Sequence, residues 1–294
     1  MSGKQEFYNQ LSNIKLPEEK TCFDYDCHGV GLMSHKVKKA GNRSWFEIIT
    51  LLLSSIVLFS ACVSESGSDT KTVGSDAEEI GVLSYVNPLM GTDSDFSLSN
   101  GNTYPAIATP WGMNFWTPMT SKMGDGWTYK YDDKKIRGIK QTHQPSPWIN
   151  DYAAFSLMAV TGELKFKEDE RESYFSHKAE TVGPDYYSVY LADYDVVAEV
   201  TPTERAAHFK FTFPENERSF ILLDAFNKGS MVKILPEERK IIGYCRNNSG
   251  GVPENFHNYF VAEFDTDFEL NHTWAEEWQL NENSTGSEGE HVGA

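Results

Sequence analysis

The chain of 294 residues carries 26 basic and 43 acidic side chains, which give a formal net charge of −17. An acidic surface repels a phosphate backbone, so this charge excludes proteins that bind nucleic acid through a basic surface. The length allows one or two domains. Aromatic residues make up 13% of the chain, a proportion that favours either a β-rich core or a face on which sugar rings stack.

The N-terminal part of the sequence is typical of targeting segments. Residues 1–32 precede a better start at Met33 and are expected to be an upstream extension. Residues 33–61 join a basic region to an apolar run that is short for a bilayer span, as in a secretory signal peptide. Small residues before Cys62 resemble a bacterial lipobox, although Phe59 replaces the usual leucine. Cys62 is therefore predicted to be lipidated.

Residues 62–80 are rich in Ser, Gly, Asp and Glu and are predicted to be a flexible linker. This linker favours a lipoprotein over the alternative, a transmembrane anchor or an uncleaved signal. The predicted location is the bacterial cell envelope, as an outer-membrane lipoprotein or in the periplasm. Contact with the membrane is expected only through the lipid on Cys62.

From residue 81 to residue 294 the sequence predicts one all-β domain. Short apolar runs alternate with turn residues, and no long stretch has a helical period. The run 219–224 is continuously apolar between Ser219 and Asp224 and predicts a strand buried on both faces. The spacing predicts an antiparallel β-sandwich, with strands at residues 186–190, 196–200, 207–213, 219–224, 240–246 and 258–264.

The C-terminal segment differs in amino-acid composition from the predicted strands before it. Residues 271–290 form an acidic, polar tail that is expected to be a loop or disordered. Residues 291–294 are similar to the first residues of another strand, so the sandwich is expected to be incomplete at its C-terminus. Cys245 has no obvious partner and is predicted to be a buried, small residue.

Residues 136–152 contain Pro145 and Pro147, and are predicted to form an ordered loop because proline is excluded from central strands and helix interiors. The loop gathers His143, Trp148 and Asp151. A ring for the apolar face of a sugar and polar groups for its hydroxyls suit a carbohydrate site. Structural roles at the sandwich edge are the alternative, and the same ambiguity holds for Trp127.

Several short motifs occur in a fixed order: VNPLMGT at 86–92, GNTYP at 101–105, WGM at 111–113, QTHQPSPW at 141–148, DY at 151–152 and ERAA at 204–207. Together they resemble the N-terminal domain of glycoside hydrolase family 92, the calcium-dependent exo-α-mannosidases. The resemblance implies a β-sandwich that packs on a C-terminal (α/α)6 barrel, with the active site at their junction. It makes Trp127, His143, Trp148 and Asp151 candidate substrate-binding residues for α-mannosides of N-glycans or mannans.

The reaction implied by this resemblance is an inverting hydrolysis assisted by Ca²⁺. Inversion needs two carboxyl groups roughly 6.5–9.5 Å apart, and calcium needs about six to eight oxygen ligands. The acidic clusters at 132–133, 168–170, 237–238 and 276–277 lie in polar turns and are expected to be solvated. No catalytic residue and no metal ligand is therefore predicted in this chain.

Two functional hypotheses follow from the missing carboxyl groups. In the first, the chain is the substrate-pocket domain of a mannosidase whose catalytic (α/α)6 domain is absent, and it is inactive alone. In the second, it is a free-standing surface lipoprotein that binds glycans without hydrolysing them.

Overall fold

The computed structural model of the protein describes residues 81–93, 103–124, 127–143, 152 and 154–294, all within the unit Gly74–Ala294. Antiparallel strands dominate, as the sequence predicts, and short 3-10 helices are the other regular elements. Across these described ranges, no helix is long and apolar enough to cross a membrane. The elements in chain order are η1 (Val82–Tyr85), β1 (Phe115–Met119), β2 (Lys135–Ile136), β3 (Gly138–Thr142), β4 (Ser156–Thr161), β5 (Ser173–Tyr174), η2 (His177–Ala179), β6 (Glu180–Val182), β7 (Tyr187–Leu191), β8 (Val196–Pro202), β9 (Ala207–Thr212), β10 (Ser219–Asp224), β11 (Ser230–Leu235), η3 (Pro236–Glu238), β12 (Lys240–Cys245), β13 (Asn258–Glu263), β14 (His272–Ala275), η4 (Glu276–Trp278), β15 (Gln279–Glu282) and β16 (Gly286–Gly289).

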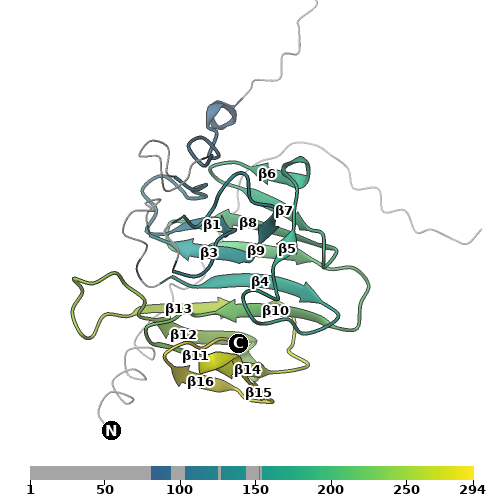
Figure 1. The fold of residues 1–294 in the computed structure, drawn as a ribbon, viewed down its shortest axis with the longest axis vertical. Coiled ribbons are helices and arrows are strands. Elements are labelled where there is room, and N and C mark those ends of the chain that lie inside the picture. Colours follow the sequence, from purple (N-terminus) through teal and green to yellow (C-terminus); the bar gives the residue numbers. More distant parts are fainter. Residues whose placement is uncertain (1–80, 94–102, 125–126, 144–151, 153) are drawn as a thin grey trace, which may run out of the picture. The chain divides into compact units, whose positions relative to one another are not determined.

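The strands build a β-sandwich from three four-stranded antiparallel sheets (Figure 1). The first sheet has the order β1-β3-β4-β10, the second β6-β7-β8-β9 and the third β13-β12-β11-β16. Trp116 of β1 packs edge-on against Phe209 of β9, with ring centroids 4.9 Å apart. Phe155, next to β4, stacks on Phe260 of β13 at 4.6 Å. These ring contacts join both other sheets to the first one in a shared core.

Alternation along the strands sets which side chains enter this core. In β8 the buried residues are Val196, Ala198, Val200 and Pro202. In β9 the predicted alternation is confirmed, because Phe209 and Phe211 pack against the core while His208, Lys210 and Thr212 are exposed. Period-two alternation is the pattern expected of a strand with one solvated face.

The prediction that β10 is buried on both faces is wrong for its first half. Ser219 is exposed, and Phe220 and Ile221 are only half-buried. The reason is positional: the first half of β10 pairs with β4 on one edge and lines a groove, whereas the second half is also bridged by the terminal segment at Asp224. An apolar run therefore does not by itself require burial on both faces.

The acidic tail is a second correction. Residues 271–290, expected to be a loop or disordered, form the β14–β15 hairpin and the strand β16, which pairs with β11. Trp274 and Val292 are fully buried and anchor the segment to the core. Acidic residues on the solvated face of these strands make the segment polar in sequence without preventing the pairing.

The residues after β16, expected to begin a strand at 291–294, pair with two neighbouring segments through isolated bridges. Gly293 bridges Asp224 on one side and Trp274 on the other, both in antiparallel orientation. The Leu223 and Ala294 backbones exchange hydrogen bonds of 2.7 and 2.9 Å. The terminal segment thus lies between β10 and β14.

Candidate functional site

The described parts of three motif segments, residues 86–92, 103–105 and 141–143, meet around the end of β3. The Thr103 N–H donates to the carbonyl of Gly91 at 3.2 Å, and the Thr103 hydroxyl donates to the carbonyl of Met90 at 3.0 Å. The Tyr104 hydroxyl lies 2.8 Å from the Thr142 hydroxyl in a buried hydrogen bond. Three segments that are separate in the sequence are therefore joined at one place in the fold.

Strand β3 places polar side chains on both of its faces, although the whole strand is buried. The prediction of a loop over residues 136–152 is accordingly wrong for residues 138–142. Pro145 and Pro147 follow the strand, and a proline disrupts pairing only at its own position and the residue before it. The signal that could have revealed β3 is the sequence Gly-Ile-Lys-Gln-Thr before the prolines.

Lys140 is the most unusual of these side chains, because it is only 3% exposed. Its ammonium group donates to the Thr128 hydroxyl at 3.4 Å and lies 5.9 Å from the centre of the Phe226 ring. A cation over an aromatic face is stabilised by the ring quadrupole. Sequence reasoning missed Lys140 because neither partner is near it in the chain.

Gln141 occupies the opposite face of β3, beside Trp116 and Phe155. Its amide nitrogen lies 3.5 Å from His143 Nε2, and its amide oxygen accepts from Asn258 at 3.4 Å. This amide links the end of β3 to β13. Gln141 was not among the predicted site residues.

Of the four predicted substrate-binding residues, the structure describes two, Trp127 and His143. His143 is half-buried directly after β3, and Trp127 is buried, with 6% of its surface exposed. Trp148 and Asp151 lie outside the described residues, as does the predicted lipidation site Cys62. At the end of β3, Gln141 and His143 thus share one face of the strand, and Lys140 lies on the other face.

Asp224 is a buried carboxylate with partners of its own. It accepts from Arg171 Nη1 at 2.8 Å and lies 2.8 Å from His291 Nε2. Burial raises the pKa of Asp224, but the charge of Arg171 and the hydrogen bond from His291 outweigh it and hold the pKa well below the usual range. A permanently ionised, paired carboxylate is suited to structure rather than to proton transfer.

Glu168 departs from the prediction that the acidic clusters are solvated. Its side chain is buried and accepts the backbone N–H of Met123. Burial raises the pKa of Glu168 above its ordinary value, and the Met123 hydrogen bond opposes the shift. The prediction is wrong here because Met123 lies 45 residues away in the sequence. The neighbouring Asp169 is exposed and forms ion pairs with Lys122 and Arg137.

No candidate metal site is found in the part of the chain that the structure describes. Within those residues, no three His, Cys, Asp or Glu side chains converge as a metal site requires. Calcium therefore stays a property implied by the resemblance.

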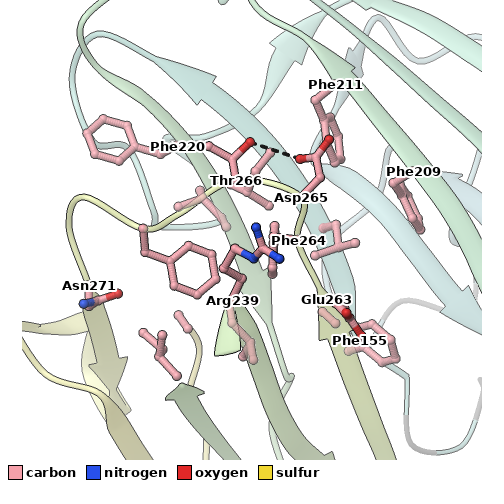
Figure 2. Close-up of a pocket in the computed structure, with 18 of the residues that line it drawn as sticks. Phe155, Phe209, Phe211, Phe220, Arg239, Glu263, Phe264, Asp265, Thr266 and Asn271 are labelled. Atoms are coloured by element: carbon pink, nitrogen blue, oxygen red, sulfur yellow. Dashed lines mark hydrogen bonds between the residues drawn. The ribbon is translucent and has the colours of Figure 1, made fainter. Parts of the chain in front are cut away.

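A groove of about 1420 Å³ lies among the described residues. Figure 2 shows Phe209 and Phe211 of β9 on one side and Phe264, which follows β13, across from them. Charged residues such as Arg239 and Asp265 also line it. Its volume exceeds the roughly 300–1,000 Å³ of ordinary small-molecule sites. No residue of this groove was predicted to be functional.

Comparison with known proteins places the fold and motifs in a family. The profile described as the glycosyl hydrolase family 92 N-terminal domain matches residues 85–294. The solved Family GH92 inverting mannosidase BT2199 from Bacteroides thetaiotaomicron is 46% identical, with a TM-score of 0.69. That likeness covers 72% of this chain and 28% of the mannosidase.

Two further relatives are more distant. The GH92 α-mannosidase BT3965 from Bacteroides thetaiotaomicron is 28% identical, with a TM-score of 0.59, over 72% of this chain and 30% of its own. An uncharacterized secreted glycosidase from Arthroderma benhamiae is 22% identical over 142 residues, which are 46% of this chain and 18% of that protein. The chain thus spans less than a third of the length of each of these relatives.

Proposed function

We propose that this chain, which belongs to the glycosyl hydrolase family 92 N-terminal domains, forms the sugar-facing wall of an α-mannosidase active site. The observation that carries this proposal is the 46% identity to a solved inverting mannosidase across 72% of the chain. The substrates are α-mannosides of N-glycans or mannans, held in part by Trp127, His143, Trp148 and Asp151. The catalytic carboxyl groups and the calcium ion belong to a partner (α/α)6 domain.

Exposed apolar side chains support packing against such a domain. Trp111 is 99% exposed, and Tyr85 and Met90 are each 77% exposed. Trp111 and its neighbour Met113 belong to one of the family motifs, and the Met113 N–H donates to the carbonyl of Glu204, in another motif, at 2.7 Å. Large apolar side chains that remain in water commonly mark an interaction surface.

The cell-envelope location is part of the same proposal. The basic region, apolar run and Cys62 of residues 33–62 support export and lipidation. The likeness to a glycosidase described as secreted agrees with export. Acylation of Cys62 is tested by intact-mass measurement of the protein from a bacterial membrane fraction. A purified mass equal to that of the unmodified chain contradicts it.

Hydrolysis distinguishes the proposal from a self-sufficient enzyme. The purified chain, incubated with α-1,2-mannobiose and Ca²⁺, is expected to release no mannose, because the acid and base that inversion needs are supplied elsewhere. Released mannose, measured by chromatography, overturns this part of the proposal. A complete family 92 mannosidase serves as the positive control.

A glycan-binding lipoprotein is the competing function, and a glycan array separates the two. A domain that supplies one wall of a pocket is expected to bind mannosides weakly or not at all on its own. Strong binding that is lost in His143→Ala and Asp151→Asn, but kept in Val261→Ala on the exposed face of β13, supports the lipoprotein instead.

A further inference from the structure

Trp127, one of the candidate sugar contacts, begins a segment without regular secondary structure. Residues 127–131, named the Trp127 segment, belong to no helix or strand, so no ladder of backbone hydrogen bonds holds them. The Thr128 carbonyl accepts the N–H groups of Thr120 at 2.9 Å and Ser121 at 3.2 Å, which fixes the backbone at one point. The orientation of the Trp127 ring therefore also depends on the other contacts of this segment.

A buried carboxylate, that of Glu180 at the start of β6, contacts the Trp127 segment. Only 1% of the Glu180 side chain is exposed. It accepts the Tyr187 hydroxyl at 2.8 Å, and the Tyr129 hydroxyl donates to it from 3.4 Å. Its Oε2 also lies 2.7 Å from His177 Nδ1. Glu180 thus satisfies the requirement that a buried polar group has hydrogen-bond partners.

Both tyrosines remain donors to Glu180 because their hydroxyls keep their protons. Burial, and after it the charge of Glu180, raises the pKa of Tyr129 well above its usual range. The same two causes raise the pKa of Tyr187. Since both side chains are almost fully buried, removing one hydroxyl leaves the carboxylate without a donor that water could readily replace.

His177 connects the same carboxylate to the backbone of the Trp127 segment. Its Nε2 lies 2.8 Å from the carbonyl oxygen of Tyr131. Its ring stacks on the Tyr131 ring, with centroids 4.0 Å apart and an interplanar angle of 4°. The Tyr131 N–H in turn donates to the carbonyl of Thr92, in one of the family motifs, at 3.1 Å. Glu180 is thus linked to the Trp127 segment twice, through the Tyr129 side chain and through Tyr131.

We infer that Glu180 is a positioning residue for the sugar site, which orients the Trp127 ring by holding the Trp127 segment. Glu180 does not touch the sugar and acts only through its neighbours. This inference rests on the proposed role of Trp127 and adds the buried carboxylate that orients this contact. A binding side chain is held accurately when packing and hydrogen bonds lock the residues around it, so the ring is oriented before a sugar arrives.

Fluorine NMR of the purified chain labelled with 5-fluorotryptophan tests this inference, because each of the seven tryptophans contributes its own resonance. Trp127→Phe and Trp111→Phe identify the resonances of these two residues. Tyr129→Phe removes one hydroxyl and keeps the ring. In this variant the Trp127 resonance is expected to move by more than its linewidth, while that of the exposed Trp111 stays in place. An unmoved Trp127 resonance overturns the inference.

Glu180→Gln provides a second measurement, because it keeps the length of the side chain and removes the charge and one acceptor. The Trp127 resonance is again expected to move. Glu199→Gln is the matched control, since Glu199 also accepts a tyrosine hydroxyl, that of Tyr186 at 2.6 Å, but from β8 and outside the Trp127 segment. It is expected to leave the Trp127 resonance in place.

A structural role alone predicts a different result for Glu180→Gln. A lower melting temperature with an unmoved Trp127 resonance shows that Glu180 stabilises the fold without orienting the ring, and this refutes the inference. If Glu180→Gln does not fold, the result for Tyr129→Phe decides. None of these measurements needs a sugar. Release of mannose or strong glycan binding by the chain therefore contradicts the proposed function without changing the outcome for Glu180.

Discussion

Replacing Gly293 by alanine tests how tightly the terminal segment packs. A Cβ atom on Gly293 would lie 1.9 Å from Cζ2 and 2.4 Å from Cη2 of Trp274. Carbon atoms in contact lie about 3.5–4.0 Å apart, so the indole or the strand must move by more than an ångström. Trp274 is 1% exposed and stacks on Trp278 at 6.2 Å, and it therefore has little room to move.

The expected loss of stability follows from these contacts. Overpacking a core costs about 1–3 kcal/mol, and loss of a buried tryptophan costs about 3–5 kcal/mol. Because Gly293→Ala lies between these cases, we expect about 3 kcal/mol. For a domain of this size that lowers the melting temperature by roughly 6–12 °C. Urea unfolding followed by tryptophan fluorescence, and thermal melting followed by circular dichroism, measure the two quantities.

Gly286→Ala is the matched control, because a Cβ on Gly286 meets only the Val232 carbonyl, at 3.6 Å. Its stability is expected to stay within about 0.5 kcal/mol of the parent protein. If both variants unfold at the same urea concentration, Gly293 does not lie against the Trp274 ring, and the placement of the terminal strand between β10 and β14 is wrong.

Four further outcomes are expected. Asp224 has a lowered pKa in the folded protein, so its contribution to the free energy of unfolding is present above the unfolded pKa of about 4 and is lost as the pH falls through the folded pKa. In Arg171→Met this loss of stability in acid should be smaller. At pH 7 the variant should unfold more easily by about 3–5 kcal/mol, because the carboxylate is left without its counter-charge. Glu168 has a raised pKa, so its ionisation opposes folding as the pH rises. In urea titrations Glu168→Gln should be more stable than the parent protein at pH 7 and not at pH 4. A gain in stability that is independent of pH contradicts the raised pKa of Glu168. Trp111→Ala should melt within about 2 °C of the parent, because the ring is 99% exposed, and a large drop in melting temperature would show that the ring is packed. Addition of EDTA should not shift the melting temperature, because the described residues contain no metal-binding group of three; a clear shift would locate a metal in this chain.

The sequence predicts the strands whose pattern is local. The alternation of Phe209 and Phe211 with polar residues is enough to identify β9, and the short spacing of apolar runs is enough for the sandwich. The prediction for the acidic tail was wrong because its strands depend on pairing with β11 and on burial of Trp274, neither of which is visible in the residues of the tail itself.

The site was predicted less completely, for the same physical reason. The motifs identified the segments that meet at β3, and His143 lies in one of them. Lys140 and Glu168 could not be placed, because their partners Phe226 and Met123 come from distant parts of the chain. Asp224 and Arg171 likewise pair across 53 residues. Roles for Trp148 and Asp151 stay predictions.

Cys245, at the end of β12, is a free thiol with no exposed surface. Its backbone is paired on both sides, with Ser230 of β11 and Asn258 of β13. Burial raises the pKa of the thiol well above its ordinary value, so the native protein offers almost no reactive thiolate. An alkylating reagent can modify Cys245 only while the sheet is open, so the rate of that modification measures how often β12 opens locally.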